Sequence, residues 1–312
     1  MTMKPQLNEL FGPRLTFPDI DARQRLGNLV GLDDHKSRLT KILGLLVNPT
    51  SLTQWAKSHH PEATALLDTV LRRPPLVVLA GDVGSGKTEL AETIGDAVAR
   101  QQKIGITLLP LSLSARGEGR VGQMTQLITS AFEIAAQEAE RYKSSEKSSG
   151  GVILLIDEAD ALAQSREAAQ MHHEDRAGVN AFIRGIDRLA SARLPAAVIM
   201  CTNRLNALDP AIRRRAAEIL SFTRPDDAQR EHVLSERLGA LKFKSAEIQA
   251  LIKATGPKSP GDLGFTFSDL TQRLIPSIVL DAYPDKAVSA TRALEIARNM
   301  LPTPAFRDDT QR

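Results

Sequence analysis

The stretch from Leu76 to Thr88, LVVLAGDVGSGKT, constrains the fold of this chain more than any other part of it. Residues 76–79 form an apolar run typical of a buried parallel strand, because both faces of such a strand must be apolar. Residues 81–88 match the phosphate-binding pattern G-x-x-x-x-G-K-[ST] at every fixed position. From Glu89 to Arg100 the apolar residues are spaced for one face of a helix. The order strand, glycine loop, helix predicts an α/β domain that binds phosphate groups.

The residue types of this loop indicate how it would bind ATP with Mg²⁺. Gly84 and Gly86 allow a tight turn, so that successive backbone N–H groups point at phosphate oxygens. The following helix adds the positive end of its dipole. Lys87 is placed to reach the β- and γ-phosphates, and the Thr88 hydroxyl is suited to ligate Mg²⁺. The candidate nucleotide-binding residues of the loop are Gly81, Asp82, Val83, Gly84, Ser85, Gly86, Lys87, Thr88 and Glu89.

A second motif, VILLIDEADAL, occupies residues 152–162 and consists of an apolar strand that ends in two acids. We expect Asp157 to hold Mg²⁺, directly or through water. We expect Glu158 to polarise the attacking water, since a carboxylate next to the metal ligand reaches past the γ-phosphate. Two acids can also simply end a strand, but their position after the glycine loop favours the functional interpretation.

Two later segments add candidates. Residues 196–203 form a buried strand that ends in Asn203, whose amide is suited to orient the attacking water or to sense the γ-phosphate. Residues 208–222 carry three consecutive arginines, Arg213 to Arg215, before a last strand. These arginines are either a solvated surface cluster or the source of one side chain that reaches a neighbouring subunit's γ-phosphate. Such an arginine increases the rate of hydrolysis ~10³- to 10⁵-fold, because it neutralises charge in the transition state.

The N-terminal part of the chain is less regular. Residues 1–28 are predicted to be an arm, because prolines and a glycine interrupt any long helix. The arm either docks through its apolar residues on a neighbouring surface or is a loosely ordered tail. Residues 29–46 open with a turn and continue as an amphipathic helix. Val30 and Gly31, in that turn, are candidates for covering the adenine base.

Composition excludes several classes of protein. The chain has 312 residues, a net charge of +3 and a single cysteine, Cys201, so that no disulfide forms within the chain and a reducing compartment is expected. The N-terminus lacks an apolar signal region, and no apolar run approaches the ~18 residues of a membrane span. We therefore expect a cytoplasmic protein without a membrane segment. The small charge excess, spread along the chain, argues against direct binding of nucleic acid.

Beyond Arg224 the predicted strands stop and four helical segments follow, at 226–242, 245–254, 266–282 and 286–300. The predicted fold class is α/β, with a parallel sheet of the P-loop NTPase type flanked by helices and a small all-helical lid. We place the large domain at 29–224, the lid at 225–302 and a C-terminal tail at 303–312.

The order of these motifs resembles that of the AAA+ ATPases over nearly all of residues 29–300. The segment LDPAIRRR after TNR is similar to the clade of unfoldases and remodellers. The chain looks like a relative of the pachytene-checkpoint ATPases. This resemblance rests on its short length, its brief N-terminal arm and the segment GFTFSDLTQRLIPSIVL. Those ATPases remodel HORMA-domain proteins, and their bacterial members are associated with antiphage systems built around a nucleotidyltransferase.

The resemblance implies a role for each matching residue. Lys87 and Thr88 match the Walker A pair, Asp157 and Glu158 match the Walker B pair, and Asn203 matches the first sensor. The arginine finger falls on Arg215 or Arg214, and we prefer Arg215 because it directly precedes the last strand. A finger that acts in trans needs a neighbouring subunit, so the resemblance implies a ring, most simply a homo-hexamer.

Two loops correspond to substrate-contacting loops of the family. Arg120, Val121 and Gly122 match the central-pore loop, where an aromatic residue usually precedes the Val-Gly pair. An arginine wedges between units of a threaded chain only through its stem and planar head, which weakens the case for a processive unfoldase. A second pore loop would lie in 165–180, where Met171, His172 and His173 either touch substrate or are solvated. At the second sensor, the family's arginine would fall near Ser268, and none is present.

The expected function is that of an ATP-hydrolysing ring that opens a closed HORMA-like partner. Three alternatives remain open. A DNA-linked loader or transposition ATPase would show ATPase activity stimulated by DNA and steeply dependent on salt. A nucleotide switch would signal by assembly and keep its function in a Glu158→Gln variant. An unfoldase that feeds a protease is disfavoured by the missing aromatic residue in the pore loop.

Overall fold

The computed structural model describes residues 11–113, 123–144, 147–160, 173–204, 208–259 and 261–305. The chain divides into two compact units. The first comprises Met1–Asn28, Asp34–Ala80 and Thr88–Ser221, and the second comprises Leu29–Asp33, Gly81–Lys87 and Phe222–Arg312. The phosphate loop therefore groups with the helical C-terminal part. We retain the division into a large domain (29–224) and a lid (225–302) as a proposal.

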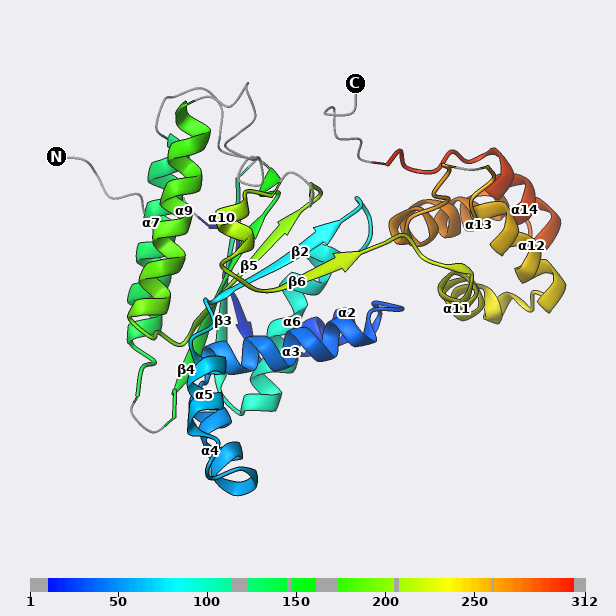
Figure 1. The fold of residues 1–312 in the computed structure, drawn as a ribbon. Coiled ribbons are helices and arrows are strands. Elements are labelled where there is room, and N and C mark those ends of the chain that lie inside the picture. Colours follow the sequence, from blue (N-terminus) through cyan, green and yellow to red (C-terminus); the bar gives the residue numbers. More distant parts are fainter. Residues whose placement is uncertain are drawn as a thin grey trace. The chain divides into compact units, whose positions relative to one another are not determined.

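A six-stranded sheet organises the first unit (Figure 1). Its order is β1-β3-β4-β5-β2-β6, and the β3–β4, β4–β5 and β5–β2 pairs are parallel. The predicted α/β class with a mostly parallel sheet is confirmed. The strands are β1 (Leu15–Phe17), β2 (Leu76–Gly81), β3 (Gly105–Ser112), β4 (Gly150–Asp157), β5 (Ala196–Thr202) and β6 (Ala216–Phe222).

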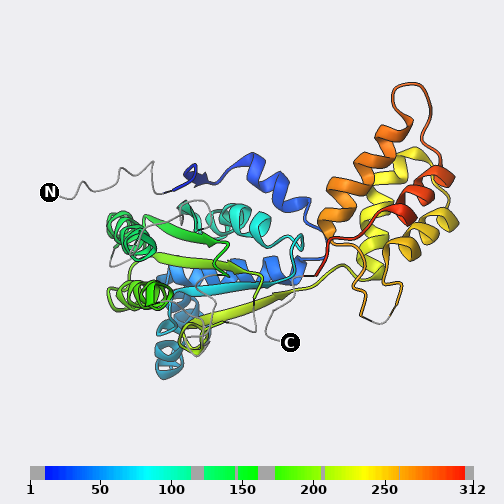
Figure 2. The ribbon, with the colours of Figure 1, turned by 90° about the horizontal axis from the view of Figure 1, so that it is seen from above.

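Helices cover both faces of this sheet (Figure 2). On one face, α7 (Gln123–Glu140) and α9 (His173–Ser191) pack together through Phe132 and Phe182, whose rings meet edge to face at 5.7 Å. A Cβ at Gly185 would lie 2.3 Å from the Phe132 ring, so the close approach of these helices requires glycine there. On the other face lie α3 (Asp33–Val47) and α6 (Lys87–Gln102), the helix that follows the phosphate loop.

The described part of the N-terminal arm is docked on the first unit. β1 pairs antiparallel with β3, with Phe17 opposite Ile106. The ring of Phe17 fills the space beside Gly95 of α6, where a Cβ would lie 2.4 Å from it. Helix α2 (Ile20–Gly27) follows, capped by the Asp19 side chain. Of the two interpretations left open by the sequence, the docked arm is the one that residues 11–28 adopt.

Two short helices, α4 (Thr50–His59) and α5 (Thr64–Leu71), precede β2. On α4 the exposed Trp55 ring stacks on His59 at 5.6 Å and packs against His60 at 5.2 Å. Across the described ranges, no group of three or more His, Cys, Asp or Glu side chains is placed to hold a metal ion. The same residues contain no helix long and apolar enough to cross a membrane.

The second unit is helical beyond Phe222, with its own apolar core that includes Leu234, Leu251, Phe265 and Leu274. The predicted helix at 266–282 is present and contains a π-helical turn directly before α13, where Pro276 supplies no backbone N–H. The elements are α11 (Asp227–Leu238), η3 (Gly239–Leu241), α12 (Ser245–Thr255), η4 (Asp269–Leu274), α13 (Ile275–Ala282) and α14 (Ala290–Asn299).

Candidate functional site

The phosphate loop has the backbone that its glycines allow. Gly84 has a φ of +70° and Gly86 a φ of +94°, in the left-handed region that only glycine enters without strain. Gly81 has a φ of +152°, and a Cβ there would lie 2.0 Å from the Phe222 carbonyl oxygen. Gly84 and Gly86 are therefore required by conformation, and Gly81 by space as well.

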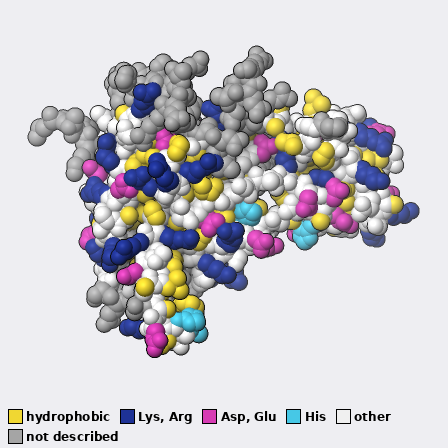
Figure 3. All heavy atoms as spheres, viewed as in Figure 1, with side chains coloured by type: hydrophobic (Ala, Val, Ile, Leu, Met, Phe, Trp, Pro, Cys, Tyr) yellow, Lys and Arg dark blue, Asp and Glu magenta, His cyan; other side chains and the backbone are white. Residues whose placement is uncertain are grey.

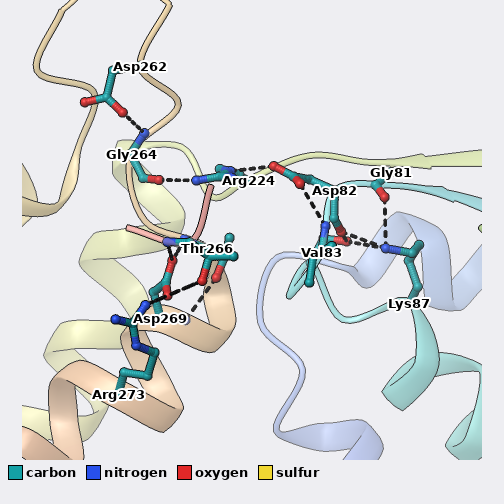
Figure 4. Close-up of polar contacts among 12 residues, drawn as sticks. Gly81, Asp82, Val83, Lys87, Arg224, Asp262, Gly264, Thr266, Asp269 and Arg273 are labelled. Carbon is teal, nitrogen blue, oxygen red and sulfur yellow. Dashed lines mark hydrogen bonds and ion pairs between the residues drawn. The ribbon is translucent and has the colours of Figure 1, made fainter. Parts of the chain in front are cut away.

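The side chain of Lys87 is buried and curls back onto this loop. Its Nζ donates to the carbonyl oxygens of Gly81 at 2.9 Å and Asp82 at 2.7 Å (Figure 4). The Ser85 hydroxyl donates to the same Asp82 carbonyl at 2.7 Å. These contacts hold the ammonium over the loop backbone, from which a phosphate ligand would draw it.

Thr88 and Asp157, the two predicted Mg²⁺ ligands, lie together in the first unit. The Thr88 hydroxyl donates to Asp157 Oδ1 at 3.2 Å. Burial raises the pKa of Asp157, while hydrogen bonds from the Glu158 backbone and from Thr88 lower it. A hydroxyl and a carboxylate are hard oxygen ligands, and protein-bound Mg²⁺ commonly uses one or two such groups together with substrate phosphates and water. The donor set thus fits Mg²⁺.

Glu158 follows in a conformation that is costly for a side chain with a Cβ. Its φ is +52°, in the left-handed region, where a non-glycine residue costs about 1–2 kcal/mol. Its backbone N–H donates to Asp157 Oδ1 at 2.9 Å. Glu158 therefore lies in a strained turn directly after β4.

Asn203, at the end of β5, is oriented by a residue that sequence reasoning missed. Asp160 Oδ1 accepts from the Asn203 backbone N–H at 2.8 Å and from the Thr202 hydroxyl at 2.7 Å. Asp160 Oδ2 accepts from the Asn203 side-chain amide at 3.1 Å. The only sequence signal was its place two residues after Glu158.

Arg215 forms a bidentate ion pair within its own chain. Its Nε and Nη2 donate to the two carboxylate oxygens of Asp187, on α9, at 2.8 and 2.9 Å. The hydrogen bonds to Asp187 raise the pKa of Arg215 above its ordinary value. Arg214 is exposed, and its Nε donates to the Pro210 carbonyl at 3.3 Å. The choice between Arg215 and Arg214 as the finger stays a prediction.

Glu89, the last candidate in the phosphate stretch, pairs with the N-terminal arm. Arg25 of α2 donates to both of its carboxylate oxygens, at 2.7 and 2.8 Å, and to Glu92 at 2.8 Å. Val30 and Gly31 belong to the second unit, where the Gly31 carbonyl accepts from Gln229 Nε2 at 3.1 Å. Their predicted contact with adenine stays a prediction.

Within the second unit, Asp82 has a partner that the sequence did not reveal. Arg224 Nε donates to Asp82 Oδ2 at 2.6 Å, and both side chains are largely buried (Figure 4). A cavity of about 1100 Å³ lies beside this pair, and Asp82 alone among the predicted phosphate-loop residues lines it. The cavity is therefore adjacent to the phosphate loop and distinct from it.

The candidate pore loops lie outside the described residues. This applies to Arg120, Val121 and Gly122, and to Met171 and His172. His173 is the first residue of α9. On the face drawn in Figure 3, lysine and arginine side chains form several separate groups with acidic side chains between them.

Comparisons with known proteins identify the family of this chain. The family model of the ATPase family associated with various cellular activities (AAA) matches residues 77–224. CD-NTase-associated protein 6 of Escherichia coli strain MS 115-1 is 65% identical over 309 residues, which cover 99% of each chain. A second protein of that name, from strain KTE188, is 35% identical over 302 residues, 96% of this chain and 99% of the relative.

A chain of the E. coli MS115-1 HORMA:CdnC:Trip13 complex superimposes with a TM-score of 0.90 and 64% identity, over 98% of this chain and 100% of that one. Rhizobiales Trip13 superimposes with a TM-score of 0.73 and 58% identity, over 94% of this chain and 99% of that one. This chain therefore belongs to the AAA family of ATPases, and to the group within it that CD-NTase-associated protein 6 represents.

Proposed function

We propose that this protein is a cytoplasmic, Mg²⁺-dependent ATPase ring, a homo-hexamer, that opens a closed HORMA-domain protein and thereby regulates a bacterial antiphage signalling system. The observation that carries the proposal is the 65% identity to CD-NTase-associated protein 6 over 99% of both chains. The match to a chain of the HORMA:CdnC:Trip13 complex, with a TM-score of 0.90, names the class of partner.

The arrangement of the site supports ATP hydrolysis by positioning and charge. The glycine loop would bind phosphate oxygens through its backbone N–H groups, and Lys87 would leave the Gly81 and Asp82 carbonyls for the β- and γ-phosphates. Glu158 would accept a proton from the attacking water, and Asn203, held by Asp160, would orient that water. Thr88 and Asp157 would hold Mg²⁺, which when bound neutralises phosphate charge.

The finger role of Arg215 explains why a ring is needed. A cation is worth most where negative charge develops on the γ-phosphate, and a finger supplied in trans reaches the phosphate of the next subunit. Asp187 fixes the direction of Arg215 through two parallel hydrogen bonds. We propose that Asp187 preorganises Arg215 for that contact.

We further propose that the loop of Arg120, Val121 and Gly122 grips the partner chain. Hydrolysis around the ring would move these loops and pull on a segment of the HORMA-domain protein. The interspersed charge on the face of Figure 3 agrees with a partner other than nucleic acid.

A pull-down with the HORMA protein of the E. coli MS115-1 complex tests the proposal. The Glu158→Gln variant should retain the partner in ATP and release it in ADP, because it binds ATP and does not complete hydrolysis. The matched control is Lys87→Ala, which should retain no partner in either nucleotide. Equal retention with and without ATP would contradict the proposed function.

A further inference from the structure

The starting observation is a negative charge inside the phosphate loop. The Asp82 carboxylate is 13% exposed, and its Oδ1 accepts from the Val83 backbone N–H at 2.8 Å. A carboxylate in a loop that receives phosphates opposes their binding unless another group neutralises its charge. The loop pattern does not specify the residue at position 82, so an aspartate there is not required for phosphate binding. Its negative charge must be compensated by a nearby cation.

Arg224 supplies that cation and also contacts a second loop. Its side chain is 7% exposed, and the residue belongs to the segment that joins β6 to α11. Its Nε donates to Asp82 Oδ2 at 2.6 Å, and its Nη1 donates to the carbonyl oxygen of Gly264 at 2.5 Å (Figure 4). One guanidinium thus connects the phosphate loop to residues 261–268, which we call the lid loop.

A second contact joins the same two loops. The backbone N–H of Ser268 donates to the Gly84 carbonyl at 3.1 Å. A Cβ at Gly84 would lie 2.8 Å from the Thr266 hydroxyl and 2.9 Å from Ser268 Cβ, so the loops are in close contact. The lid loop touches the phosphate loop at Gly84 directly and at Asp82 through Arg224.

The lid loop itself is held firmly at its C-terminal end. Thr266 N–H donates to Asp269 Oδ2 at 3.0 Å, and Asp269 N–H donates to the Thr266 hydroxyl at 3.0 Å. Asp269 is fully buried and also accepts from Thr303. A displacement of Gly264 or Ser268 would therefore be passed to the helices that follow rather than absorbed locally.

We propose that Arg224 is a positioning residue that couples the nucleotide state of the phosphate loop to the lid loop through Asp82. Lys87 Nζ holds the carbonyl of Asp82 at 2.7 Å. A lysine that turns to bound phosphates releases this carbonyl, the peptide of Asp82 adjusts, and Arg224 carries the adjustment to Gly264. The inference rests on the proposed nucleotide site and is independent of the proposed partner.

Arg224→Lys in the full chain is the sharpest test. Lysine keeps the charge that Asp82 requires, but an ammonium is a single donor centre and does not reproduce the fixed fork of a guanidinium. The control is Arg292→Lys, since Arg292 likewise pairs with acidic side chains of the second unit, in its case Asp281 and Glu295. Two measurements are made: affinity for a fluorescent ADP analogue, and amide hydrogen exchange of peptides covering 261–268 with and without ADP.

In the wild-type chain and in Arg292→Lys, ADP should slow exchange in the lid loop. In Arg224→Lys the affinity should fall by no more than about threefold, while the ADP-dependent change in lid-loop exchange falls below half. A residue that only neutralises Asp82 would be rescued by lysine in both measurements. A full ADP-dependent change in Arg224→Lys would therefore overturn the inference.

A double-mutant cycle tests the coupling between Asp82 and Arg224 independently. Arg224→Ala should weaken ADP affinity about tenfold, which corresponds to ~1.4 kcal/mol, because it leaves the Asp82 charge uncompensated. The double variant with Asp82→Ala should recover most of that loss. Additive losses would overturn the coupling through this pair. Failure of the wild-type chain to bind ADP would overturn the proposed function and this inference with it, whereas normal binding with additive losses removes the inference alone.

Discussion

The carboxylate of Asp160 binds both the backbone N–H and the side-chain amide of Asn203, at 2.8 and 3.1 Å. It also accepts the hydroxyl of Thr202, so one acid fixes the end of β5. The orientation of Asn203 is therefore set by the segment directly after β4, which also carries the predicted catalytic acid Glu158.

Replacing Asp160 with alanine should lower kcat for ATP about 10–100-fold, because a small misplacement of a water-orienting group has an effect of that size. The affinity for ATP should stay within about twofold, since the hydrogen bonds of Asp160 described above are to Thr202 and Asn203 and not to the phosphate loop. Steady-state ATPase assays and nucleotide titration check the two quantities. An unchanged kcat would show that Asn203 needs no support from Asp160.

Lys87→Ala should abolish nucleotide binding. The lysine ammonium is the one charge of the loop placed to neutralise the β- and γ-phosphates. The loss is read as the absence of a thermal shift with ADP, which raises the melting temperature of the wild-type chain by mass action. Wild-type affinity in this variant would contradict the assignment of residues 81–88 as the phosphate loop.

Arg215→Ala should bind ATP normally and hydrolyse it ~10³-fold more slowly, as expected for a finger residue. Mixed rings should lose more activity than the fraction of variant subunits, because each variant disables its neighbour's site. Arg214→Ala is the matched comparison. If Arg214→Ala gives the larger loss of activity in the same assay, the finger is Arg214, and the role of Asp187 is confined to holding Arg215 in place.

Glu158→Gln should leave a ring locked in the ATP state and inactive in remodelling. The left-handed φ of +52° is kept, because glutamine has the same backbone preferences, and only the proton-accepting charge is lost. ATP retained per subunit after gel filtration is the measurement. Full biological function in this variant would favour a nucleotide switch over a motor.

Asp269 gives the helical unit a defined sensitivity to acid. Burial raises the pKa of Asp269, but hydrogen bonds from Thr266, Thr303 and Arg273 outweigh burial and bring it down to about 2. Because the folded-state pKa lies below the unfolded one, the stabilisation is complete above about pH 4, near the pKa of an unfolded aspartate, and is lost as the pH falls toward 2.

The matched variant is Asp269→Asn, which keeps the shape and loses the charge. At pH 7 it should show faster amide exchange than wild type in peptides covering 264–270, and the difference should shrink as the pH falls below 4. Rates are corrected for intrinsic exchange at each pH. A difference that is constant with pH would mean that the charge of Asp269 does not stabilise this segment.

The local motifs could be predicted because their chemistry and their chain order coincide. The stretch 76–88 is one strand, one turn and one helix start, and each of these leaves its own pattern in adjacent residues. The ends of β4 and β5 follow in the same way from apolar runs that stop at polar residues. In such cases the side chains that carry the chemistry are also the ones that end the element.

The contacts of Asp160 and Arg224 could not be predicted in this way. Arg224 lies 142 residues from Asp82 in the chain, and nothing in its neighbours points to that partner. β1 escaped prediction because a strand of three residues between prolines has no periodicity. The helix at 266–282 was predicted, but its π-helical turn was not, because the effect of Pro276 depends on how the preceding turn is packed.

β1 also covers the edge of β3, which would otherwise be open to other molecules. Its three residues hydrogen-bond along β3, which pairs with β4 on its other side. A chain lacking its first 18 residues would leave β3 as a bare apolar edge, the kind of edge on which further strands add. Loss of solubility, rather than loss of catalysis, is therefore the first consequence expected of trimming this N-terminus.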